Sequence, residues 1–94
     1  MNGRAEGRGV MCYACGAQND HGLKMEFRRE NDRAVCDYAP CEYQQGYPGR
    51  MHGGIVATML DEAMGSAVYG AAQWGATARL NIRFRRTVPI DARL

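Results

Sequence analysis

Long apolar runs, an excess of one charge and low-complexity segments are all missing from this chain of 94 residues. The first ten residues, MNGRAEGRGV, hold no apolar stretch, and no later run has the length that a membrane-spanning helix needs. We therefore expect no secretory signal, no membrane partner and a cytoplasmic location. Lys and Arg number 12 against 10 Asp and Glu, so the net charge of +2 gives no general argument for nucleic acid as a partner.

The chain is short, so it has room for one small domain. A domain of this size buries a modest fraction of its surface and is marginally stable without further support. The apolar share of 46% is ordinary for a globular protein and excludes disorder throughout. We expect residues 1–10 to form a flexible tail and residues 11–94 to fold.

Alternation of apolar and polar residues predicts a β-hairpin and a later strand. Leu23, Met25 and Phe27 alternate with charged residues, residues 30–33 are polar, and residues 34–38 are typical of a returning strand. Residues 77–86 alternate most clearly, which predicts a strand with four apolar residues on one face: Ala78, Leu80, Ile82 and Phe84.

The segment HGGIVATMLDEAMG, residues 52–65, carries the most functional information. A helix is predicted from Gly53 or Gly54 to about Tyr69, and it is apolar on most of its circumference, as expected of a central helix wrapped by a curved sheet. Asp61 lies well inside this helix, where an unpaired carboxylate is costly to bury. The two glycines let a ligand approach the free backbone N–H groups of the first turn. A helix start that favours anions and a partly desolvated carboxylate are two components of a hydrolytic site.

Three segments resemble, in the same order, the hotdog-fold acyl-CoA thioesterases of the 4-hydroxybenzoyl-CoA and phenylacetate-degradation type. They are CYACGAQNDHGLKMEF (12–27), YQQGYPGRMHGGIVATMLDEAMG (43–65) and TARLNIRFRRTVPI (77–90). The specific part is His-Gly-Gly with an acid nine residues after the histidine. The resemblance implies an α+β hotdog fold, in which an antiparallel sheet wraps around a central helix. Because this family continues with further strands, we expect residues 11–94 to be a partial, C-terminally truncated hotdog domain.

The same resemblance implies an enzyme that hydrolyses the thioester of a small or medium acyl- or aryl-CoA, with no cofactor and no metal. The Gly53 N–H, with Gly54 beside it, would polarise the thioester carbonyl, and Asp61 would act as general base or nucleophile. Eight residues separate Gly53 from Asp61, which is about 12 Å along one helix. One copy therefore cannot present both groups to one acyl carbon, and we expect a homo-oligomer, either a dimer or a dimer of dimers.

Several neighbours of this pair keep two interpretations each. His52 belongs to the predicted catalytic group with Gly53 and Asp61, where it positions the turn or caps a backbone carbonyl rather than acting as the base. Gln45 either lies near the thioester or only bonds loop backbone. Arginines on the polar face of residues 77–86 either meet the phosphates of coenzyme A, for which their forked donors are suited, or stay solvated and ion-paired. These arginines are Arg79, Arg83, Arg85 and Arg86, and we take Arg83 and Arg85 as candidates for substrate binding.

Glu62, Gly65 and Ser66 lie close to Asp61 in the same helix. Glu62 is rotated by about 100° from Asp61 on the helix, so we expect it to have a structural or ion-pairing role. Some relatives carry a hydroxyl one turn after the acid. Gly65 occupies that position here, and Ser66 is one residue out of phase.

The four cysteines offer a competing arrangement. Cys12 and Cys15 with Cys36 and Cys41 could bind zinc, with His21 in place of one of them. The second pair lacks the paired spacing of zinc knuckles, so we favour small buried or half-buried thiols. The alternative function is a non-catalytic hotdog module that binds or senses acyl-CoA, and the presence of Asp61 favours the enzyme.

Overall fold

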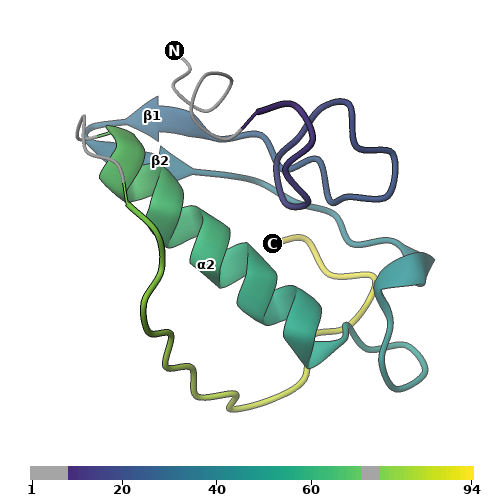
Figure 1. The fold of residues 1–94 in the computed structure, drawn as a ribbon. Helices are drawn as coiled ribbons and strands as arrows, with labels where there is room; N and C mark the ends of the chain where they lie inside the picture. Colours follow the sequence, from purple (N-terminus) through teal and green to yellow (C-terminus); the bar gives the residue numbers. More distant parts are fainter. Residues whose placement is uncertain (1–8, 71–74) are drawn as a thin grey trace.

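The computed structural model describes residues 9–70 and 75–94. Most of the predicted tail (residues 1–10) and most of the predicted loop around Trp74 lie outside the described residues. In Figure 1 a short hairpin lies against the C-terminal end of one long helix, and extended segments run beside that helix. The elements are β1 (Arg28–Glu30), β2 (Arg33–Val35), the 3-10 helix η1 (Glu42–Gln44) and α2 (Gly53–Gly70).

The predicted hairpin is confirmed, although its strands are short. The strands β1 and β2 pair antiparallel, with Arg28 opposite Val35 and Glu30 opposite Arg33. The two turn residues, Asn31 and Asp32, have φ angles of 51° and 67°. Positive φ at both positions is the geometry of the tight turns whose twist matches that of the flanking strands.

The first predicted strand begins later than its apolar pattern suggests. Lys24 has a φ of 54°, which interrupts a regular strand. Leu23 and Met25 instead donate their backbone N–H groups to Tyr13 O and Ala14 O, at 2.9 and 2.8 Å. Residues 23–25 therefore hold the N-terminal loop in place instead of pairing within the hairpin.

The prediction of a strand at residues 77–86 is wrong. This segment runs back along α2 (Figure 1) and forms no ladder with another described strand. Its alternation is that of a strand, but a strand exists only where a second backbone offers hydrogen bonds. Leu80 and Phe84 remain 38% and 55% exposed.

Regular pairing begins further along the same segment. Met51 N donates to Val88 O at 2.8 Å and Ile90 N donates to Gly49 O at 2.9 Å, so residues 88–90 lie antiparallel to residues 49–51. Tyr38 and Leu94 exchange both backbone hydrogen bonds at 2.8 Å. These contacts bring the C-terminal residues next to the beginning of α2.

The helix α2 forms where it was predicted, from Gly53 to Gly70. Its inner face supplies Ile55 and Met59, which pack against a core of Ala14, Leu23 and Met25. The hairpin strand β2 contacts the same helix. Three residues on another side of α2 stay 43–51% exposed, so the predicted all-round cover is partial within this chain: Leu60, Met64 and Val68. Within residues 9–70 and 75–94, neither helix has the combined length and hydropathy required to cross a bilayer.

Candidate functional site

His52 caps the N-terminal end of α2. Its carbonyl accepts hydrogen bonds from Ile55 N and Val56 N, at 3.0 and 3.1 Å. Its ring Nδ1 accepts the Gly54 N–H at 2.9 Å. Side-chain acceptors at this position satisfy N–H groups that the helix itself cannot. The interpretation of His52 as the residue that positions the turn agrees with this geometry.

The two glycines of the turn differ in their surroundings. The Gly54 N–H is engaged by His52, and a Cβ on Gly54 would lie 3.1 Å from that ring. The Gly54 N–H is therefore already engaged within this chain, and the role of Gly54 as a second donor to substrate stays a prediction. The Gly53 N–H donates to no other described residue, and a Cβ on Gly53 would meet only Phe84, at 3.8 Å. Gly53 thus presents a free donor at the positive end of an 18-residue helix.

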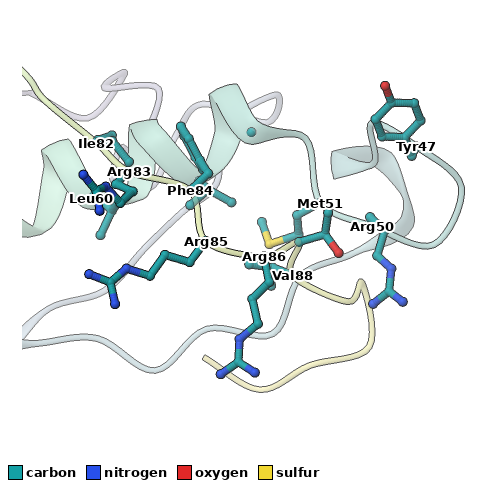
Figure 2. A pocket seen from close by; sticks show the side chains of 13 residues that line it. Tyr47, Arg50, Met51, Leu60, Ile82, Arg83, Phe84, Arg85, Arg86 and Val88 are labelled. Carbon is teal, nitrogen blue, oxygen red and sulfur yellow. The ribbon is translucent and has the colours of Figure 1, made fainter.

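A cavity of about 400 Å³ opens beside Gly53 (Figure 2). Its walls come from the loop before α2, from the first two turns of α2 and from the segment that returns along the helix. The hydrogen bond from Met51 N to Val88 O joins the first and last of these walls. The lining residues are Tyr47, Arg50, Met51, Gly53, Val56, Leu60 and residues 82–88.

Four arginines contribute to this cavity, and they are the only charged residues among those that line it: Arg50, Arg83, Arg85 and Arg86. In Figure 2 the side chains of Arg50, Arg85 and Arg86 extend away from α2, whereas Arg83 lies near Leu60. Arginine binds phosphate through paired donors, so this surface is suited to a phosphorylated ligand. Arg83 and Arg85 line the cavity together with Gly53, and Arg79 lies outside the lining. Substrate binding by Arg83 and Arg85 stays a prediction.

Arg50 was not singled out from the sequence. It joins the cavity because its backbone pairs with Pro89, a contact between residues far apart in the chain. Its place two residues before His52 was the only local signal of its position.

Asp61 is half-buried and accepts a hydrogen bond from Thr77 Oγ1 at 2.5 Å. A hydroxyl that donates to a carboxylate fixes the orientation of its oxygens. Sequence reasoning sought this hydroxyl one turn after the acid, where Gly65 and Ser66 stand, and missed Thr77. Only its place on the polar face of residues 77–86 hinted at a role. Asp61 is not among the residues that line the cavity at Gly53.

Gln45 belongs to the loop that precedes the helix. Its Oε1 accepts the Gly49 N–H at 2.5 Å and its Nε2 donates to Glu42 O at 2.9 Å. Both ends of the side-chain amide are engaged by loop backbone. Of the two interpretations, these contacts favour the loop role, and substrate binding by Gln45 stays a prediction.

Glu62 points to a different neighbourhood from Asp61, as its rotation on the helix predicted. It is 8% exposed, and the Cys12 thiol approaches its Oε1 at 4.0 Å. Cys15 lies beside them, and burial, together with hydrogen bonding to Glu62 and Cys12, raises the pKa of its thiol to about 12.

Comparison with known proteins places this arrangement in a family. Residues 48–94, which include α2 and nearly all of the cavity wall, match the thioesterase superfamily. The chain is 43% identical over 80 residues to acyl-coenzyme A thioesterase THEM4 of Bos taurus, covering 83% of this chain and 32% of that protein. It is 36% identical over 66 residues to acyl-coenzyme A thioesterase THEM5 of Homo sapiens, covering 70% of this chain and 27% of that protein. No solved structure matches.

The chain therefore belongs to the thioesterase superfamily, and the predicted hotdog family is confirmed. The helix and the antiparallel hairpin are the parts of the hotdog fold that the described residues contain. The chain spans about a third or less of the length of these two relatives.

Proposed function

We propose that this chain carries the catalytic helix of an acyl-CoA thioesterase. The observation that supports this most directly is the cavity that Gly53, with its free N–H, and four arginines line together. A thioester carbonyl needs a hydrogen-bond donor, and coenzyme A needs cations for its phosphates. The proposal is supported by the fact that one cavity of about 400 Å³ is lined by residues that offer both kinds of group.

The proposed reaction adds water across the thioester. Asp61 accepts a proton from the attacking water, or attacks the carbonyl itself as nucleophile, and Thr77 holds the carboxylate in one orientation. Negative charge that develops on the carbonyl oxygen is stabilised by the Gly53 N–H at the helix N-terminus. When Asp61 acts as base, the C–S bond breaks and the proton that Asp61 took from water passes to the leaving thiolate. When Asp61 acts as nucleophile, C–S cleavage leaves an acyl–Asp61 anhydride, which a water molecule then hydrolyses, and a proton from that water reaches the thiolate. Both routes consume one water and give the free acid and coenzyme A.

The site that performs this reaction combines two copies of the chain. Gly53 and Asp61 are about 12 Å apart along α2 at about 1.5 Å per residue, and Asp61 is absent from the lining of the Gly53 cavity. A two-fold axis would place the Gly53 turn of one copy near Asp61 of the other. Leu60 and Met64, on the turns next to Asp61, are 43% and 51% exposed and offer apolar surface for such an interface. The substrate is a small or medium acyl- or aryl-CoA, and the cytoplasmic location stays a prediction.

The test is thiol release from a panel of acyl-CoAs, with the full-length protein and its Asp61→Asn variant. We expect kcat of the variant to fall at least about a hundredfold, because a general base usually contributes a factor of that size. Substrate binding should be kept. Asp91→Asn, an exposed acid outside the cavity lining, serves as the control. Hydrolysis at the wild-type rate by Asp61→Asn would remove Asp61 from the mechanism. Binding of acyl-CoA without turnover by the wild-type protein would establish the non-catalytic module instead.

A further inference from the structure

A second cluster of chemically active side chains lies away from the proposed thioesterase site. Cys12, Cys15 and Glu62 each offer one ligand atom, and these atoms all lie within 4.8 Å of one another. Cys15 is 4% exposed and Glu62 is 8% exposed. Cys12 and Cys15 belong to the N-terminal loop, and Glu62, 50 residues after Cys12, belongs to α2. The cluster therefore joins the loop to the helix.

The local backbone around the two cysteines is fixed by a tight turn. Gly16 N donates to Cys12 O at 2.7 Å, and a Cβ on Gly16 would lie 2.4 Å from Cys12 N. Only glycine fits there, so the turn Cys12–Gly16 requires Gly16. A Cys-x-x-Cys turn presents two sulfurs on one side of the backbone, as structural zinc sites require.

We propose that Cys12, Cys15 and Glu62 bind a zinc ion. Two thiolates and one carboxylate form a donor set that suits zinc better than magnesium or calcium, which prefer oxygen ligands alone. Tetrahedral bonds of about 2.3 Å to sulfur and about 2.0 Å to oxygen place the ligand atoms about 3.5 to 3.8 Å apart. The present spacing, with Cys12 Sγ 4.0 Å from Glu62 Oε1, needs side-chain shifts of less than about 1 Å to reach that geometry. Water completes the fourth position.

The four-cysteine site considered from the sequence does not form. Cys36 and Cys41 lie outside the cluster, and the third protein ligand is a carboxylate from the helix. The two adjacent acids of the helix therefore have different partners. Glu62 holds the metal, whereas Asp61 accepts a hydrogen bond from Thr77. The zinc ion would therefore fasten the N-terminal loop to the helix that carries Asp61, without touching the thioester. A small core gains most from such a link.

Cobalt(II) titration of the full-length, reduced, metal-free protein tests this proposal, because thiolate-to-cobalt charge transfer gives a near-ultraviolet absorption band. We expect one cobalt ion per chain, displaced by zinc. Cys12→Ser and Cys15→Ser should abolish the band, and Glu62→Gln should keep it but weaken zinc binding at least about tenfold. Cys36→Ser and Cys41→Ser are matched controls and should titrate like the wild type.

Folding is followed separately, by far-ultraviolet circular dichroism of each metal-free variant. Zinc should raise the Tm of the wild type and of Cys41→Ser, and it should leave the Tm of Cys12→Ser unchanged. If Cys15→Ser does not fold, the Cys12→Ser and Glu62→Gln variants still test the proposal, because Cys12 is only half-buried. A reduced wild-type protein that binds no metal, or that only forms a Cys12–Cys15 disulfide, would overturn the proposal. So would a band that persists in both Cys12→Ser and Cys15→Ser.

Discussion

Mixing two inactive variants tests whether one active site draws on two copies of this chain. Gly53→Val blocks approach to the free N–H, and its Cβ has room because the nearest atom, on the Phe84 ring, is at an ordinary distance of 3.8 Å. Asp61→Asn removes the carboxylate. Each variant alone should lose at least about a hundredfold in turnover. In a mixed dimer, one of the two sites receives an intact Gly53 from one copy and an intact Asp61 from the other.

The expected recovery follows from counting subunits. Random reassociation puts about half of the dimers in the mixed form, and one site of two is intact in each, so the mixture regains about a quarter of wild-type activity. That is far above the residual activity of either parent. If both groups acted from one copy, every site in the mixture would contain a damaged residue, and no activity would return.

Thr77 supplies an internal control for the same experiment. It bonds Asp61 within one chain, so Thr77→Val and Asp61→Asn damage the same half of the site. Gly53→Val should therefore complement Thr77→Val, whereas Asp61→Asn should not. The assay is thiol release from acyl-CoA after co-expression with two affinity tags, with sedimentation to establish the mixed dimer. Mixed dimers with no more activity than the average of their parents would refute the two-copy site.

Three further substitutions probe single contacts. Thr77→Val should lower kcat about tenfold with little change in KM, and Thr77→Ser should restore it, since one hydrogen bond to a charged group contributes about 1.5 kcal/mol or more. Arg85→Ala should raise the KM for acyl-CoA about tenfold, more at low ionic strength, while Arg79→Ala, outside the cavity, should not. His52→Ala should lower the free energy of unfolding by about 1 kcal/mol in chemical denaturation, and His52→Asn, which keeps a side-chain acceptor, should lose less. Unchanged KM, kcat or stability in these variants would contradict the corresponding contact.

Local signals predicted the helix and the hairpin turn well. Glycines bound α2 at Gly53 and Gly70, and the apolar pattern between them is long, so its limits could be predicted within a residue. The turn at Asn31 and Asp32 is likewise a matter of two residues and their tolerance of positive φ. Neither feature depends on distant parts of the chain.

The prediction of a strand at residues 77–86 was wrong because strand pairing depends on distant parts of the chain. Alternation reports which side chains suit a half-buried strand, but pairing depends on a neighbouring backbone that no local pattern specifies. Residues 88–90, which alternate less clearly, are the ones that find a partner, because the loop at residues 49–51 lies beside them. The same long-range contact brings Arg50 into the cavity.

The residues of the candidate site are likewise of two kinds: some could be proposed from local sequence, and others depend on long-range contacts. Gly53, Asp61 and the pair Arg83 and Arg85 could be proposed from spacing and family resemblance, and the structure places three of these four in one cavity lining. Thr77 could not, because its hydroxyl reaches Asp61 only after the chain has turned back along the helix. The pairing of Glu62 with Cys12 has the same origin, as it joins residues 50 positions apart.

The Gly-Gly turn shows why a motif alone does not assign roles to its residues. Two adjacent glycines at a helix start look equivalent in sequence, and both offer N–H groups that the helix leaves unsatisfied. The His52 ring removes that equivalence, since it accepts the Gly54 N–H and occupies the space where a Gly54 side chain would lie. Gly54 is then required for the cap, and Gly53 is left as the free donor beside the arginines. A substitution at Gly54 should therefore act through loss of the cap and of stability, whereas one at Gly53 should act on turnover.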